Sequence, residues 1–167
     1  MSDRVDVILD QWRRERPDLD PSPMAVLGRL VRTARAVEAR QQMTFSRHGL
    51  DGGSFDVLAT LRRSGPPYEL SPLELTEAAM VTSSATAQRL NKLVDRGLVS
   101  RNKDQRDGRG RRVRLTPEGM KVIEEALPEH LGTQQALLQG LGSADQALMI
   151  GLLQRIESNS GEYPSEA

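Results

Sequence analysis

A dense cluster of basic side chains lies between Arg96 and Arg114. It holds eight basic residues against two acidic ones, a local excess of six positive charges, although the 167-residue chain carries 23 basic and 23 acidic residues and has no net charge. The basic residues of this cluster are Arg96, Arg101, Lys103, Arg106, Arg109, Arg111, Arg112 and Arg114. Groups gathered in this way either contact phosphates or form a solvated surface without a partner.

The middle of this cluster has the sequence of an exposed turn. Arg109 stands between Gly108 and Gly110, at the tip of a hairpin loop that we expect over residues 104–110. An arginine carried on such a tip suits the narrow minor groove of duplex DNA, whose negative potential attracts guanidinium groups. Asp107 is expected to orient Arg109 through a charge-assisted hydrogen bond. The DNA contacts that we predict in this cluster are Lys103, Arg106, Arg109, Arg111 and Arg112.

A second set of polar residues precedes the basic cluster and opens an expected helix that ends at Gly97. A helix that enters the major groove needs small or hydrogen-bonding side chains in its first turns, where it meets base edges and phosphates. The residues that meet this requirement are Thr82, Ser83, Ser84, Thr86, Gln88 and Arg89. Alone, they could equally form the start of a capped surface helix. Directly before the basic cluster, they favour contact with DNA.

The elements that would position these residues can also be predicted. Ser71-Pro-Leu-Glu74 has the spacing of a capping box at the start of a helix over residues 72–79. After a tight turn, a helix is expected over 82–96, followed by strands over 98–103 and 111–116. Two helices and a two-stranded hairpin in this order predict a winged helix-turn-helix. The fold class is therefore mainly α with a small β wing.

Helices are expected on both sides of this winged core, which we assign to residues 54–116. The patterns predict helices over 5–16, 23–46 and 54–63 before the helix-turn-helix. After it, a helix begins at Pro117 and runs to about Leu141, and Pro128 should kink it or divide it in two. A last helix opens with a capping box at Ser143–Gln146.

Composition excludes several other classes of protein. The chain has no cysteine and only two histidines, so we expect no disulfide, metal site or bound cofactor. The sequence carries no nucleotide-binding or nucleophile motif, which argues against an enzyme. No apolar run reaches the roughly 20 residues of a membrane span, so a cytoplasmic protein without membrane contact is expected. Five aromatic residues other than histidine leave little for stacking on unpaired bases, which disfavours binding to RNA or single strands.

Residues 75–119 resemble the MarR family of winged-helix regulators. The resemblance rests on a Leu-x6-Thr-Ser-x2-Thr run from Leu75, the Leu-Val-Asp-Arg-Gly-Leu-Val-Ser-Arg segment 93–101, an Asp-x-Arg wing at 107–109, and Leu-Thr-Pro-Glu-Gly at 115–119. It implies one MarR-type domain over 1–167, with dimerisation helices over 23–47 and 117–158. It also implies a homodimer that binds a pseudo-palindromic operator in double-stranded DNA, usually a repressor released by a small ligand.

The N-terminal segment is similar to the urate-responsive branch of that family, the HucR and PecS type. An additional helix over 1–16 that carries a tryptophan is typical of this branch. The resemblance implies that an anionic effector such as urate is bound by Trp12, Asp56 and Arg101, with Ser64 as a fourth polar residue. From the residues alone, Trp12 could instead be the apolar anchor of the first helix, and Asp56 with Arg101 could be a structural ion pair.

Two alternatives to this function stay open at the level of sequence. The first is a regulator of the same family that responds to another phenolic compound, antibiotic or metabolic acid. The second is a protein-interaction module that does not bind DNA, in which the terminal helices form the partner surface and the wing binds an acidic protein. Binding to the protein's own upstream DNA would separate the two.

Overall fold

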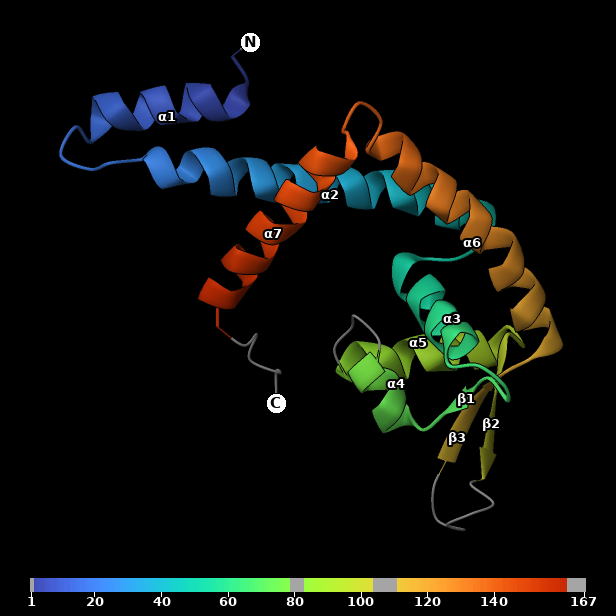
Figure 1. The fold of residues 1–167 in the computed structure, drawn as a ribbon. Helices are drawn as coiled ribbons and strands as arrows, with labels where there is room; N and C mark the ends of the chain where they lie inside the picture. The colour runs from blue at the N-terminus through green and yellow to red at the C-terminus, as the bar shows by residue number, and fades with distance from the viewer. Residues whose placement is uncertain (1, 79–82, 104–110, 162–167) are drawn as a thin grey trace. The chain divides into compact units, whose positions relative to one another are not determined.

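The computed structural model describes residues 2–78, 83–103 and 111–161, and these residues form seven helices and three strands (Figure 1). In chain order the elements are α1 (Arg4–Glu15), α2 (Ser22–Arg47), α3 (Gly52–Arg63), β1 (Glu69–Leu70), α4 (Pro72–Ala78), α5 (Ser83–Asp95), β2 (Val99–Lys103), β3 (Arg111–Leu115), α6 (Pro117–Leu137) and α7 (Ser143–Asn159). The chain divides into two compact units, residues 1–42 and 43–167. The mainly helical fold with a small antiparallel sheet confirms the predicted fold class.

In the first unit, α1 packs against the N-terminal part of α2. Asp3 caps α1 by accepting hydrogen bonds from the backbone N–H groups of Val5 and Asp6, at 2.7 and 3.1 Å. The guanidinium of Arg29 on α2 pairs with both carboxylates, at 2.9 Å from Asp3 and 2.7 Å from Asp6. Val5 and Leu9 are buried. The exposed salt bridges contribute little by themselves, so the two buried side chains are the main anchors of α1.

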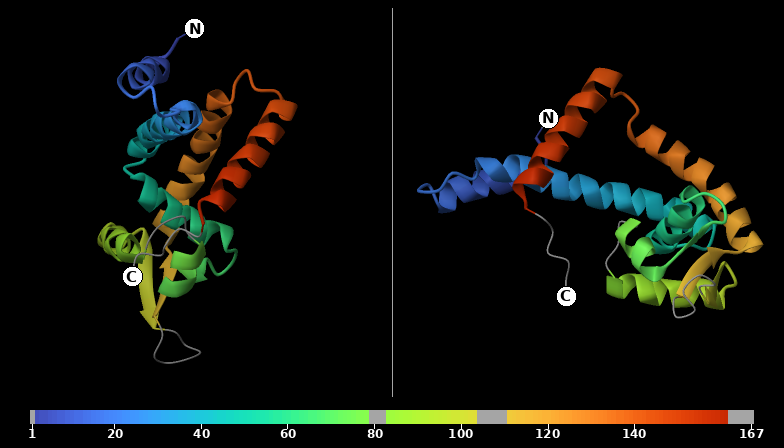
Figure 2. Two further views of the ribbon diagram at one scale, coloured as in Figure 1. Left: turned by 90° about the vertical axis from the view of Figure 1, so that its left-hand side faces the viewer. Right: turned by 60° about the horizontal axis from the view of Figure 1, so that its bottom comes forward.

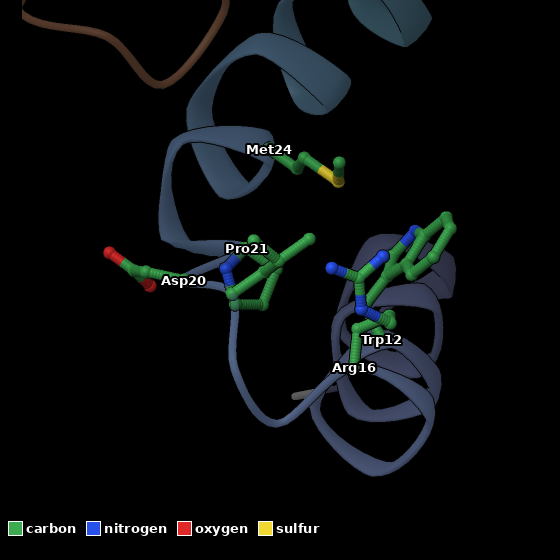
Figure 3. A pocket seen from close by; sticks show the side chains of 6 residues that line it. Trp12, Arg16, Asp20, Pro21 and Met24 are labelled. Carbon is green, nitrogen blue, oxygen red and sulfur yellow. The ribbon is translucent and has the colours of Figure 1, made fainter.

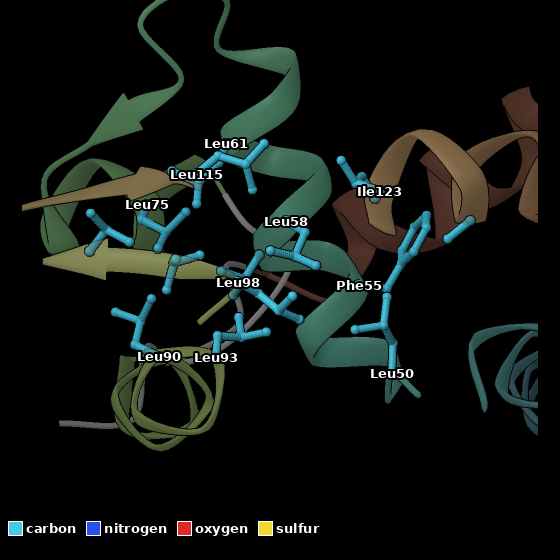
Figure 4. Packing of buried hydrophobic residues seen from close by; sticks show 14 of the residues in the cluster. Leu50, Phe55, Leu58, Leu61, Leu75, Leu90, Leu93, Leu98, Leu115 and Ile123 are labelled. Atoms are coloured by element: carbon cyan, nitrogen blue, oxygen red, sulfur yellow. The ribbon is translucent and has the colours of Figure 1, made fainter. Parts of the chain in front are cut away.

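In the second unit, one apolar core joins the helices to the sheet (Figure 4). Five elements each contribute a side chain that is completely buried: Leu58 from α3, Leu75 from α4, Leu93 from α5, Val113 from β3 and Ile123 from α6. Burying a side chain of this size stabilises the folded state by about 1.5–3 kcal/mol. This shared core fixes α4 and α5 relative to the sheet, and both views of Figure 2 show these two helices beside it.

The sheet has the strand order β1-β3-β2, with both pairs antiparallel. The hairpin of β2 and β3 confirms the two predicted strands, with Val99 opposite Leu115 and Lys103 opposite Arg111. The strand β1 was not predicted, because two residues are too few to show an alternating pattern. It adds Glu69 and Leu70 to the free edge of β3.

The junction between the sheet and α6 explains the Leu-Thr-Pro-Glu-Gly segment. Thr116 is the N-cap of α6: its hydroxyl accepts a hydrogen bond from the N–H of Gly119 at 3.0 Å and lies 2.7 Å from the carbonyl of Gly97, to which it donates. A side chain at position 119 would overlap the carbonyl oxygen of Leu98. Glycine is therefore required for the close approach of α6 to the start of β2.

α6 continues through Pro128 to Leu137, so the predicted division at Pro128 is wrong, whereas a kink there stays a prediction. The prediction for the start of the last helix was also wrong in detail. The cap of α7 lies one residue earlier than expected, since Asp145 accepts the N–H of Gly142 at 3.1 Å. A carboxylate is a stronger acceptor than the amide of Gln146, which the sequence interpretation had placed in this role.

Among the described residues, no helix is both long and apolar enough to cross a membrane.

Candidate nucleic-acid interface

The helix-turn-helix begins at a well-defined cap. The backbone N–H of Ser71 donates to Glu74 Oε2 at 2.7 Å, and the N–H of Glu74 donates to Ser71 Oγ at 3.1 Å, which confirms the predicted capping box. The cap starts α4 at Pro72, and Leu75 then anchors the helix in the core. The position of α4 is thus set at both its start and its inner face.

The second helix of the motif, α5, turns its leucines inward. Leu90 and Leu93 are buried against α3 and the sheet, while Gln88 is exposed. Ser83, Ser84 and Thr86 lie in the first turns of α5, as predicted for a helix that meets DNA by its N-terminal end. Thr82 lies outside the described residues.

Arg89 is half-buried on α5, and its side chain crosses the start of α3. A side chain at Gly53 would overlap the guanidinium of Arg89, so the glycine leaves room for it. The pKa of the neighbouring Asp51 carboxyl is lowered: burial raises it, but hydrogen bonds from Ser54 and the positive charges of Lys92 and Arg89 outweigh burial. The charge of Arg89 therefore also acts within the protein, a role that the sequence did not reveal.

The predicted contacts on the strands of the wing occupy different environments. Arg111 is exposed, and Lys103 ends β2 opposite it. Arg112 is half-buried and lies 3.2 Å from a carboxylate oxygen of Glu69 and 3.2 Å from one of Glu74. Three predicted residues of the loop lie outside the described part of the chain: Arg106, Asp107 and Arg109.

Other members of the basic cluster also have partners within the protein. Arg114 donates to Glu69 at 2.7 Å, and Arg96 donates to the backbone carbonyl of Gly49 at 2.6 Å. The six excess charges of the cluster are therefore partly balanced by acids that come from another stretch of the sequence. Glu69 was missed because nothing in a two-residue strand marks it as the partner of these arginines.

Trp12, which we predicted to bind an effector, lines a pocket of about 250 Å³ in the first unit (Figure 3). Trp12 is 44% exposed. The residues that line the pocket with it are Arg16, Leu19, Asp20, Pro21 and Met24. Arg16 already forms a two-point pair with Asp18, at 2.7 and 2.6 Å, which raises the pKa of its guanidinium. The pocket thus combines an accessible aromatic face with a cation that has an acidic partner.

The other three residues predicted to bind an effector belong to the second unit. Asp56 is half-buried on α3. Arg101 is exposed on β2 and donates to Asn91 Oδ1 on α5 at 2.8 Å. Ser64 is the C-cap of α3, and its hydroxyl donates to the carbonyl of Leu61 at 2.7 Å. The participation of these residues and Trp12 in one effector site stays a prediction, as does a contact between Asp56 and Arg101.

Within the described ranges, no group of three or more histidine, aspartate or glutamate side chains is arranged to hold a metal ion.

Comparisons with known proteins agree with this geometry. Residues 48–110 match the model of the MarR family. The chain is 36% identical, over 93% of its own length and 93% of the other protein, to the HTH-type transcriptional regulator PecS of Dickeya dadantii. Among solved structures, it is similar to Sco3205 of Streptomyces coelicolor, a MarR family transcriptional regulator in complex with DNA, with a TM-score of 0.76, 25% identity, and coverage of 89% and 93%.

A second solved structure concerns a regulator with a small effector. The chain matches BpsR of Bordetella bronchiseptica, whose DNA binding is regulated by 6-hydroxynicotinic acid, with a TM-score of 0.71 and 26% identity. The match covers 79% of this chain and 92% of BpsR.

Proposed function

Since the chain belongs to the MarR family of transcriptional regulators, which are not enzymes, we propose that it is a cytoplasmic homodimeric repressor that binds a pseudo-palindromic DNA operator and is released by a small anionic effector. One observation carries the proposal: the helix pair α4 and α5 is followed directly by a basic hairpin, in a chain that is similar to PecS over almost its whole length.

In the proposed complex, the two α5 helices of a dimer enter successive major grooves about 34 Å apart. The first turns of α5 carry Ser83, Ser84 and Thr86, whose short side chains allow the backbone to approach the DNA closely. Arg109, beyond the end of β2, enters the flanking minor groove, where it neutralises phosphate charge and is attracted by the negative potential.

Mobility-shift titration with duplex DNA from the protein's own upstream region tests this function. We expect specific binding that weakens steeply with salt, and we expect Arg109→Ala to lower both the affinity and the salt dependence. Arg14→Ala, on α1, is a matched control that removes one positive charge at an exposed position far along the chain from the wing. If no upstream fragment binds specifically, the interaction-module alternative is favoured instead.

The proposed effector is a small aromatic acid or phenol, with urate as the first candidate. Trp12 offers an accessible ring face in a pocket of suitable size, and the similar protein BpsR is regulated by an aromatic acid. The pair of Arg16 with Asp18 implies that an anion must compete with Asp18 for the guanidinium.

The single tryptophan makes this part of the proposal directly measurable. Titration with urate should quench Trp12 fluorescence and lower the affinity for the operator fragment. 6-Hydroxynicotinic acid tests a second aromatic acid, and an uncharged phenol tests whether the anionic group matters. If saturating urate changes neither signal, urate is excluded as the effector while the assignment as a DNA-binding regulator stands.

A further inference from the structure

We propose that Arg112 is a positioning residue: it ties the wing to the first helix of the helix-turn-helix through Glu69 and Glu74, and does not itself contact DNA. We call these three residues the Arg112 clamp. The inference rests on the proposed function, because the geometry that it sets is the one that reads the operator.

The contacts of Arg112 use the whole guanidinium group. Its Nε lies 3.2 Å from Glu69 Oε1, its Nη2 donates to the backbone carbonyl of Glu69 at 3.3 Å, and its Nη1 lies 3.2 Å from Glu74 Oε2. The planar fork of arginine can meet several acceptors at once, which the single ammonium of lysine cannot do with the same geometry. One side chain of β3 thereby holds both β1 and α4.

Burial indicates that these contacts are stronger than those of an ordinary surface pair. The side chain of Glu69 is 14% exposed and that of Arg112 is 26% exposed. Glu69 also accepts a hydrogen bond from Arg114 at 2.7 Å, so one carboxylate is shared by two arginines. In this setting, removal of a partner leaves charge that is poorly solvated, which costs more than the loss of an exposed ion pair.

The acidic partner on α4 explains why the clamp matters for DNA. Glu74 Oε2, the atom nearest Arg112, also accepts the N–H of Ser71 in the cap that starts α4. The cap of the first helix and the root of the wing thus meet at one carboxylate. Because α4 and α5 share the core with β3, a change at this carboxylate alters the orientation of the wing relative to the helix pair.

Arg111 is a matched neighbour with the opposite character. It precedes Arg112 on β3, points to the other face of the strand and is exposed. A phosphate contact and a positioning residue respond differently to substitution, because only the former releases counterions when DNA binds. The two arginines can therefore be compared within one strand.

The experiment measures affinity for the operator fragment over a series of salt concentrations. We expect Arg112→Ala to weaken specific binding about tenfold with an unchanged salt slope, whereas Arg111→Ala should lower the slope by about one. Arg112→Lys keeps the charge and should restore little of the affinity, since one ammonium cannot span both acids. The inference is wrong if Arg112→Ala lowers the slope as Arg111→Ala does, or if Arg112→Lys binds like the unaltered protein.

For Glu74→Gln, the change in charge and the loss of the clamp predict opposite changes in DNA affinity. Glutamine keeps an acceptor for the N–H of Ser71 but removes a negative charge near the wing. Charge alone would make DNA binding tighter, whereas loss of the clamp should make specific binding several-fold weaker. Tighter specific binding by Glu74→Gln would contradict the clamp.

A measurement without DNA separates this inference from the proposed function. Arg112→Ala and Glu69→Gln, made singly and together, should change the unfolding equilibrium constant non-additively, because both remove the same contact. Additive effects would reject the clamp even if the protein binds DNA. Absence of specific DNA binding by the unaltered protein would reject the proposed function while coupling between the two substitutions would still support the clamp.

Discussion

Large apolar side chains are buried in the winged core but exposed on α7. In the core, Leu58 and Leu61 are completely buried by other parts of the chain. On α7, Leu148 is 64% exposed and Ile150 is 57% exposed, and none of the residues of this helix is buried. Apolar residues are abundant in both regions, so composition alone does not explain the difference.

The winged core buries its apolar side chains within one chain, whereas the apolar surface of α7 is exposed to solvent in a single chain. Exposed apolar side chains grouped on one helix mark an interaction surface more often than a free surface. In the proposed homodimer, a second copy covers this surface, and the same patch then serves both partners.

The largest effect is expected from Leu58→Ala in the core. The substitution removes a completely buried side chain and leaves a cavity among the helices and the sheet, which should cost about 2–5 kcal/mol of unfolding free energy. Chemical denaturation measures this change. Leu148→Ala removes the same atoms from an exposed position, and should change the stability of the winged core by much less. Equal losses for the two variants would contradict the comparison.

This contrast also marks what the sequence could predict. The helical spacing of the apolar residues in α3 and in α5 predicts that Leu58, Leu90 and Leu93 face the interior, and each is buried. The apolar stripe that the sequence predicts on the last helix has no cover in the described chain, because periodicity shows that a face is apolar but not what covers it.

At the candidate interface, the sequence likewise predicts local contacts but not contacts between distant residues. Local signals predict the caps at Ser71 and at Thr116, which directly precedes Pro117, since each cap lies within three residues of its partner. Arg112 was predicted as a DNA contact from its charge alone. Its partner Glu69 is 43 residues away in the sequence, and only the pairing of β1 with β3 brings the two together.

Charges placed on the apolar surface of α7 should weaken the proposed dimer. The double variant Leu148→Asp/Leu152→Asp places two charges, one helical turn apart, on its exposed apolar surface. If this surface is the dimer interface, buried charge should raise the dissociation constant of the dimer at least tenfold, which is about 1.4 kcal/mol. Sedimentation or light scattering over a range of protein concentrations measures the shift.

Gln154→Asp is the control for the α7 variant, because it adds a charge at an exposed polar position of the same helix. It should leave the assembly unchanged. If the double variant dimerises as tightly as Gln154→Asp does, α7 does not form the dimer surface, and the contrast with the winged core needs another explanation.

A third, smaller effect is expected at the boundary of the winged core. Thr116→Ala removes the hydroxyl that caps α6 and its hydrogen bonds to the carbonyl groups of Gly97 and Leu98, and should cost about 1 kcal/mol. Thr116→Ser keeps the hydroxyl and should recover most of the loss in a denaturation experiment. If serine does not restore stability, the methyl group and not the cap accounts for the effect.

The smallest effect concerns a titrating group of the second unit, His130 of α6, whose ring is tilted against those of Phe45 and Phe55 at centroid distances of 5.1 and 4.7 Å. Burial lowers the pKa of this imidazole below its ordinary 6.5, because the charged form is poorly solvated there. The unfolded chain therefore takes up the proton first as pH falls. The free energy of unfolding should therefore decrease as the pH falls below about 6.5. Above this pH, the contribution of the neutral His130 is fully retained.

The test is the unfolding free energy at pH 7.5 and pH 5.5 for the unaltered protein and for His130→Gln. Glutamine has no charge to bury in this range, so the variant should lose less stability between the two pH values than the unaltered protein does. The neighbouring pair of His48 with Glu129, at 3.5 Å, is present in both proteins. A pH dependence that is identical in the two proteins would show that the aromatic surroundings of His130 accommodate its charge, and that burial in this part of the second unit is weaker than in the core around Leu58.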